Sequence, residues 1–131
     1  MKLKFFVAND IASKAKATIH QTGKLGFSNE AISYLQIKED MYIKFAQNEE
    51  DENDLNLYAL LTTQNTEECF KISKAGNYYY VNTKGLFDSI GVNYKETKIL
   101  YDITKIEVEG MSMIKLIRRE IKKKKKEVID K

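Results

Sequence analysis

The residues most suited to binding chemistry are aromatic and basic ones in the second half of the chain. Three consecutive tyrosines, Tyr78–Tyr80, lie between lysines, and aromatic rings interleaved with basic side chains can stack bases and neutralise phosphates. Because side chains alternate between the two faces of a strand, we expect Tyr78 and Tyr80 to point inward and Tyr79 outward. Tyr79 is therefore the ring predicted to be available for stacking. The same pattern also occurs on ordinary half-exposed strands.

The C-terminal segment carries the strongest local charge. Five consecutive lysines, Lys122–Lys126, follow Arg118 and Arg119. Residues 115–131 hold nine basic and three acidic side chains, a net charge of +6, whereas residues 1–114 hold 13 basic and 16 acidic ones, a net charge of −3. The +3 of the whole chain therefore arises in this segment. Basic runs bind polyanions by counterion release, and they also serve simply as solubilising tails.

These observations define an expected nucleic-acid-binding set. It combines lysines of two predicted hairpins, the outward tyrosine and the basic segment. Its members are Lys24, Lys74, Tyr79, Lys84, Arg118, Arg119, Lys122, Lys123, Lys124, Lys125 and Lys126. Lys14, Lys16, His20 and Lys71 belong to the same sheet faces. Phosphate contacts of this kind position a protein on nucleic acid without specifying a base sequence.

An acidic segment interrupts the first half of the chain. Residues 49–54 contain five carboxylates in six positions, which could bind a hard cation or imitate a phosphate run for a basic partner. Asp51 and Asn53 fit two positions of an EF-hand loop, but Leu55 and Asn56 break that pattern. We expect a solvated hairpin loop whose charges discourage pairing between sheet edges.

Catalysis has little support in the sequence. His20 and Cys69 are the single histidine and the single cysteine, 49 residues apart, and a Cys–His pair needs hydrogen-bond reach and a third orienting group. A structural thiol and a surface histidine fit better, and no phosphate-cradling glycine loop or H-E-x-x-H element occurs. We expect no enzymatic activity, no catalytic residue, no metal site and no cofactor. One cysteine and no continuous apolar run of signal-peptide length indicate a cytoplasmic protein.

The elements that must position these residues form an internal repeat. Segments 17–61 and 70–117 follow the same order of patterns, with apolar residues alternating on either side of Gly23 and Gly76 as in a tight hairpin. The matched positions are Ile19 with Ile72, Gly23 with Gly76, Leu25 with Tyr78, Phe27 with Tyr80 and, after a two-residue shift, Ala31, Ile32, Leu35 and Ile37 with Leu86, Phe87, Ile90 and Val92. Chance similarity between two amphipathic stretches is the alternative.

A short helix and a second strand pair complete each repeat. Ser28 or Asn29 is the expected N-cap of the first helix, and Asn82 or Thr83 that of the second. Gly91 is expected in the left-handed conformation after the second helix, with Gln36 at the equivalent place. The strand pairs are expected near 41–45 with 57–61 and near 99–103 with 113–117, so each repeat is ββαββ.

The first half resembles the swapped-hairpin domain of AbrB, SpoVT and MazE. The residues that carry the resemblance are Ile19, Gly23, Lys24, Leu25, Phe27, the helix Glu30–Leu35, Ile37 and Met41–Phe45. Members of that family usually pair two chains to complete an interlocked barrel, so two copies in one chain imply a pair built internally. Because most members are DNA-binding regulators or antitoxins, the resemblance implies DNA binding. Pur-alpha-like single-strand binders are a weaker comparison.

The sequence thus predicts a β-rich α+β domain over residues 1–118, with two ββαββ repeats packed as a pseudo-twofold barrel-like unit. Residues 1–16 are expected as an added strand or arm and 119–131 as a basic tail. The leading function is non-enzymatic binding of DNA or RNA, with a regulatory role implied by the resemblance. The alternative is an interaction or structural accessory protein of a phage or mobile element, favoured by the acidic body. The expected partners include a protein or a second copy, and no membrane.

Overall fold

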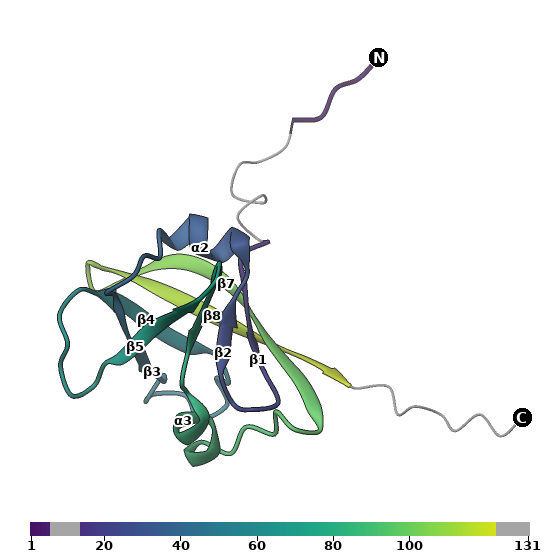
Figure 1. Cartoon of the computed structure of the whole chain (residues 1–131). Coiled ribbons are helices and arrows are strands. Elements are labelled where there is room, and N and C mark those ends of the chain that lie inside the picture. The colour runs from purple at the N-terminus through teal and green to yellow at the C-terminus, as the bar shows by residue number, and fades with distance from the viewer. Residues whose placement is uncertain (6–13, 123–131) are drawn as a thin grey trace, which may run out of the picture.

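The protein is built mainly from β-strands joined by turns and loops. The computed structural model describes residues 1–5 and 14–122 (Figure 1). The strands within these ranges are β1 (Lys16–Ile19), β2 (Leu25–Phe27), β3 (Tyr42–Ala46), β4 (Leu57–Thr62), β5 (Phe70–Ala75), β6 (Tyr78–Val81), β7 (Thr97–Val108) and β8 (Met111–Lys122). The helices are α2 (Asn29–Leu35) and α3 (Lys84–Ser89). Neither helix is long and apolar enough to cross a membrane.

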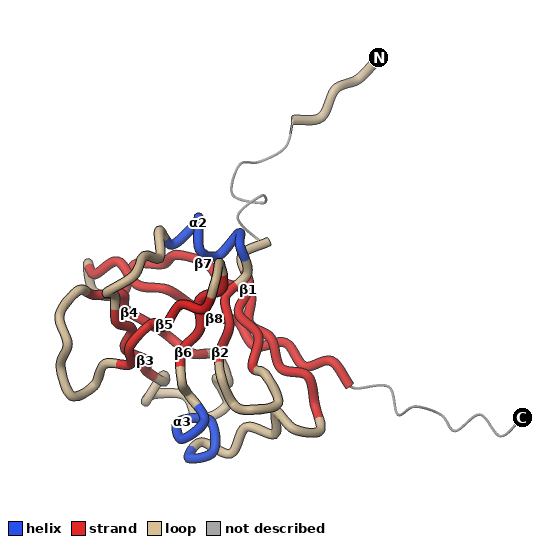
Figure 2. The backbone as a smooth tube through the Cα atoms, viewed as in Figure 1, coloured by secondary structure: helices blue, strands red, loops and turns tan. Residues whose placement is uncertain are grey.

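The strands form one antiparallel sheet that closes on itself. Its hydrogen-bonded order is β1-β2-β6-β5-β3-β4-β8-β7, and β7 pairs again with β1. Figure 2 shows the resulting barrel-like ring, with α2 near one end and α3 near the other. The prediction of a β-rich, barrel-like sheet is confirmed. Helices contribute less than the class α+β implies, because the two described helices span only seven and six residues.

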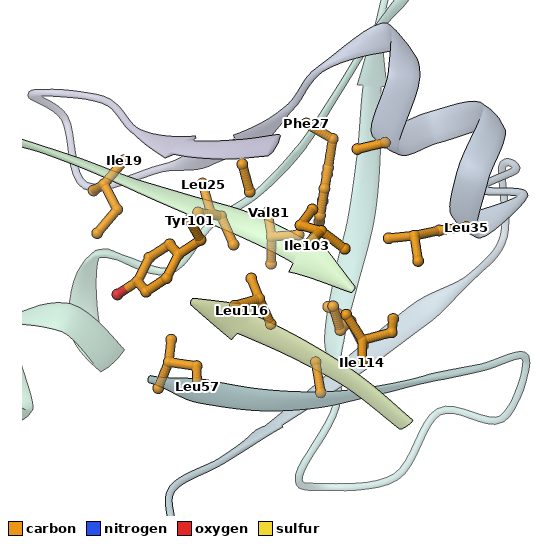
Figure 3. Packing of buried hydrophobic residues seen from close by; sticks show 14 of the residues in the cluster. Ile19, Leu25, Phe27, Leu35, Leu57, Val81, Tyr101, Ile103, Ile114 and Leu116 are labelled. Atoms are coloured by element: carbon orange, nitrogen blue, oxygen red, sulfur yellow. The ribbon is translucent and has the colours of Figure 1, made fainter. Parts of the chain in front are cut away.

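Alternate strand residues fill the inside of the ring. Ile99, Tyr101 and Ile103 of β7 are each buried, as the alternating pattern predicts. Figure 3 shows how side chains from several strands converge on the interior; among those labelled are Ile19, Leu25, Phe27, Leu57, Val81, Tyr101, Ile103, Ile114 and Leu116. Each large apolar side chain buried in this way stabilises the fold by about 1.5–3 kcal/mol.

The helix ends follow the predicted capping residues in part. The Ser28 hydroxyl accepts a hydrogen bond from the Ala31 N–H at 3.1 Å, as expected of an N-cap. Gly91, which follows the C-cap Ile90 of α3, has a φ of 73°, which confirms the left-handed conformation predicted there, and Gln36, the C-cap of α2, has a φ of 56°. Thr83 precedes α3 but makes no side-chain capping bond.

Thr83 instead joins α3 to the first hairpin. Its buried hydroxyl donates to the carbonyl oxygen of Gly23 at 2.8 Å. Gly23 has a φ of +88°, and a Cβ at this position would lie 2.8 Å from the Cα of Lys84. The turn between β1 and β2 therefore packs directly on the first residue of α3, and only glycine fits the contact.

Strand β8 extends into the segment that the sequence assigned to the tail. It pairs with β7 as far as Lys122, opposite Thr97. Residues 119–122 are thus strand, because β7 is long enough to supply a backbone partner for each of them. The remaining predicted tail, and residues 6–13 of the predicted arm, lie outside the described residues. Residues 1–5 form neither helix nor strand, and Lys16 belongs to β1.

Candidate nucleic-acid interface

Four side chains meet on the outer surface of β1, β2 and β6. They are His20, Lys24, Tyr78 and Tyr80, which we call the aromatic patch. Val81 is fully buried and pairs with Leu25. Because neighbouring residues of a strand point to opposite faces, Tyr80 and Tyr78 point outward.

The predicted orientation of the three tyrosines is therefore wrong. Tyr79 shares the inward face with Val81 and is packed, partly buried, against the core. The Lys74 Nζ lies 5.6 Å from the centroid of the Tyr79 ring and 3.5 Å from a carboxylate oxygen of Glu39. Tyr79 therefore engages the core and the exposed Lys74, and the outward rings are Tyr78 and Tyr80.

The aromatic patch is held together by ring contacts. Tyr78 and Tyr80 stack with their centroids 5.9 Å apart and their planes inclined by 18°. The Lys24 Nζ lies 4.8 Å from the centroid of the Tyr80 ring, a cation–π geometry. The His20 ring meets Tyr78 edge-on, and its Nε2 shares a hydrogen bond with the Tyr78 hydroxyl. Partial burial raises the pKa of Tyr78 above its ordinary value.

Gly26 provides the space that Tyr78 and His20 occupy. It pairs with Tyr80 in the sheet, and a Cβ at this position would overlap the Tyr78 hydroxyl and lie 2.7 Å from the His20 Nε2. Its φ lies outside the left-handed region, so the backbone itself would accept a side chain. The missing side chain is what lets the Tyr78 ring lie over β2.

Gly26→Ala is expected to displace Tyr78 and to break its hydrogen bond with His20 while the barrel remains folded. His20 is the single histidine of the chain, so its imidazole signals in a proton NMR spectrum should shift clearly. Gly85→Ala is the matched control, since a Cβ at Gly85 would meet nothing within 4 Å. Unchanged His20 signals in Gly26→Ala would contradict the described position of Tyr78.

A second basic group lies on the outer face of β1, β7 and β8. The Lys16 Nζ is 2.7 Å and the Arg119 guanidinium 3.2 Å from the two carboxylate oxygens of Asp102. Burial acts to raise the pKa of Asp102, but the hydrogen bonds from Lys16 and Arg119 lower it below the ordinary value. Two cations therefore share one ionised carboxylate, which leaves one positive charge in excess on the same outer face as His20.

The other predicted site residues lie apart from the aromatic patch. Lys84, on α3, forms an ion pair with Asp88 at 2.6 Å. The Arg118 side chain is only 16% exposed and is bonded to Glu120, so it is largely withdrawn from solvent. The side chain of Lys122 and the whole of Lys123–Lys126 lie outside the described part of the chain. Among the predicted residues whose side chains the structure describes, only Lys24 belongs to the aromatic patch.

The acidic loop and the cysteine have local partners. Asp54 accepts hydrogen bonds from the Tyr58 hydroxyl at 2.7 Å and from the Asn56 N–H at 2.9 Å, and the Tyr58 bond is the main cause of its lowered pKa. The Cys69 Sγ lies 3.3 Å from the Thr66 hydroxyl and donates to the Gln64 carbonyl at 3.4 Å. No group of three or more metal-ligating side chains occurs in the part of the chain that the structure describes.

The sequence reasoning missed two residues of the aromatic patch, Tyr78 and Tyr80, and also Gly26, over which Tyr78 lies. Alternation alone does not reveal them, because residues 78–81 are all apolar or aromatic, and Val81 sets the facing of β6 only once its pairing with Leu25 places it inward. His20 and Lys24 were already assigned to one sheet face. Comparison with protein-family models, with curated proteins and with solved structures finds no match for this chain.

Proposed function

We propose that this protein is a non-enzymatic nucleic-acid-binding protein and that the aromatic patch is its base-stacking surface. The observation that carries the proposal is the stacked pair of Tyr78 and Tyr80 with Lys24 over the Tyr80 ring. Tyr78 is 38% exposed, so part of its ring is accessible to solvent. Base–aromatic stacking is worth about 1–3 kcal/mol per base and tolerates any base sequence. Single-stranded DNA or RNA, whose bases are unpaired, is the substrate that suits such a surface.

Charge around the patch supports the same function. Lys16 and Arg119 lie on the same outer face. Together with the carboxylate of Asp102 that they share, these two cations carry a net charge of +1. The C-terminal segment, with a net charge of +6 over residues 115–131, begins in the strand that carries Arg119. In this proposal Lys24, Lys16 and Arg119 hold phosphates on the outer face, while unpaired bases stack on the tyrosines.

The strand order supports a further part of the proposal, that the chain consists of two ββαββ repeats related by a pseudo-twofold axis. Exchanging β1–β4 for β5–β8 leaves the ring order unchanged. An axis through the pairs Gly26–Tyr80 and Tyr58–Lys115 accounts for this. Such an internal pair is what the resemblance to the AbrB, SpoVT and MazE domain implies.

Fluorescence anisotropy of a labelled oligothymidine of about ten nucleotides tests the proposal. Tyr80→Ala should weaken binding about tenfold or more, because it removes one stacking ring. Tyr34→Ala is the matched control, since Tyr34 on α2 also has a lysine over its ring, with the Lys105 Nζ 4.7 Å from the centroid. No binding at low salt, or equal losses in the two variants, would refute the aromatic patch as the binding surface.

The contribution of the basic segment is separated by a chain that ends at Lys122. We expect this chain to bind more weakly and with a smaller salt dependence, because fewer phosphates are neutralised. It should still be sensitive to Tyr80→Ala. Binding that disappears completely with residues 123–131 would show that the segment acts alone.

A protein-binding role is the second candidate function. It is favoured by an open groove of about 770 Å³ between the β3–β4 and β7–β8 hairpins. Its lining combines the apolar side chains of Val108 and Met113 with the carboxylates of Glu49 and Glu50. Apolar surface rimmed by charge is typical of protein contacts.

A further inference from the structure

Strand β8 has a backbone edge that no other strand covers. Its ladder with β7 continues to the pair Thr97–Lys122, whereas its ladder with β4 ends at the pair Leu57–Leu116. Figure 1 shows the end of β8 projecting beyond the ring next to β7. The last residues of β8 therefore have a paired side, toward β7, and an open side in the described part of the chain.

The hydrogen bonds identify which groups face the open side. The Arg118 N–H donates to the side-chain oxygen of Asn56 at 2.9 Å, so Asn56 ends the β4 ladder. In an antiparallel pair alternate residues bond to the same neighbour. Glu120 accordingly presents its N–H and C=O on the open side, while Arg119 and Ile121 bond to β7.

A concavity adjoins this edge and gives room for an added strand. It measures about 430 Å³ and is lined by Asn53, Asp54, Leu55, Asn56, Arg118 and Glu120. Leu55 is 59% exposed there. Unpaired strand edges of this kind pair readily with extended segments of other chains.

The side chains along the edge specify the chemistry of the partner. On the outer face, Ile117 and Ile121 are 38% and 43% exposed, with Arg119 between them. A strand laid beside β8 would gain apolar contact with the two isoleucines and an ion pair with the arginine if the side chains it presents on that face, at every second position, were apolar, acidic and apolar in turn.

Pairing of this edge with the same edge of a second copy is disfavoured. An antiparallel pair centred on Glu120 would place Glu120 opposite its own copy and Arg118 opposite Lys122. Like charges directly opposite each other in a sheet are destabilising, and lysines protect natural edges from self-pairing.

We propose that the β8 edge from Arg118 to Lys122 binds an extended acidic segment of a partner protein as an additional strand. On the outer face the segment presents apolar, acidic and apolar side chains at every second position, opposite Ile117, Arg119 and Ile121, and its backbone pairs with Glu120. This inference does not depend on the aromatic patch, which lies on β1, β2 and β6.

Binding of a labelled Thr-Val-Thr-Glu-Thr-Val-Thr peptide, which presents Val, Glu and Val on one face, to the full chain tests the proposal. Glu120→Pro removes the N–H that faces the open side and leaves the ladder with β7 intact. We expect it to weaken peptide binding about tenfold. Glu120→Ala keeps the N–H and should bind within about threefold of the original chain. The same peptide with lysine in place of glutamate should not bind.

Amide hydrogen exchange gives a second readout that does not require a variant. The Glu120 amide should exchange rapidly in the free protein and become protected when the acidic peptide is added. The amides of Arg119 and Ile121, which bond to β7, should be protected in both states. Absence of acidic-peptide binding, equal binding of the lysine peptide, or an unprotected Glu120 amide in the complex would each overturn the proposal.

Discussion

Replacing Phe87 by alanine should destabilise the protein by about 3–5 kcal/mol, the cost of removing a fully buried aromatic ring. Phe87 is the single fully buried residue of α3, at 0% exposure, and it stacks on Tyr101 with the ring centroids 6.4 Å apart. Its ring fixes the helix to the inside of the barrel-like ring. Urea denaturation followed by circular dichroism measures the loss.

Leu86→Ala is the control for the Phe87 substitution, because Leu86 lies beside it on α3 and is only partly buried. It should cost clearly less. Tyr101 provides an independent probe, since burial raises its pKa to about 12. If Phe87→Ala opens this end of the ring, the pKa of Tyr101 should fall toward its ordinary value near 10. Equal losses for the two variants would contradict the anchoring role of Phe87.

The second large effect is expected at Gly23. Gly23→Ala should lower the free energy of unfolding by about 1–2 kcal/mol because of the left-handed backbone. Overpacking against the Lys84 Cα should add about 1–3 kcal/mol. The shift of the turn would also strain the hydrogen bond from the Thr83 hydroxyl to the Gly23 carbonyl.

Gly76→Ala separates the two causes. Gly76 has a φ of +61°, yet a Cβ there would meet nothing within 4 Å. This variant should therefore show the conformational cost alone. Thermal or urea unfolding of both variants measures the difference, and a Gly76 variant as unstable as the Gly23 variant would show that the contact with α3 does not matter.

The fold was largely predictable because its local signals agree with its tertiary structure. Alternation located the strands around Ile43, Leu57 and Tyr101, and Ser28 marked the start of α2. The facing of β6 was not predictable from alternation, because residues 78–81 are all apolar or aromatic and either phase fits. Only the pairing of Val81 with Leu25 and Ile72 decides it.

The alignment of the two halves stays a prediction, and it depends on the same facing of β6. The sequence matched Leu25 and Phe27 with Tyr78 and Tyr80, whereas the proposed axis through the pair Gly26–Tyr80 would move the match one residue further along. Under that match, the two inward residues of β2 correspond to Tyr79 and Val81. The glycine of one half then corresponds to the outward tyrosine of the other.

The partners of the predicted cations were predictable only where they are local. Lys84 and Asp88 are four residues apart on one helix, a spacing that itself favours an ion pair. Lys74 on β5 meets Glu39 in the turn before β3, and Arg119 on β8 meets Asp102, 17 residues earlier on β7. Such contacts follow from the sheet order, which composition and spacing do not determine.

The order of strands around the ring has a consequence for the way the chain is made. The hairpins of the first and second halves alternate, because β2 is followed by β6, β5 by β3 and β4 by β8. Neither half therefore possesses a continuous sheet of its own. During synthesis the ring can close only after β8 has left the ribosome. Until then, strands of the first half have backbone edges without hydrogen-bond partners from the second half. Folding is then governed by long-range contacts, which form slowly and favour assistance by chaperones.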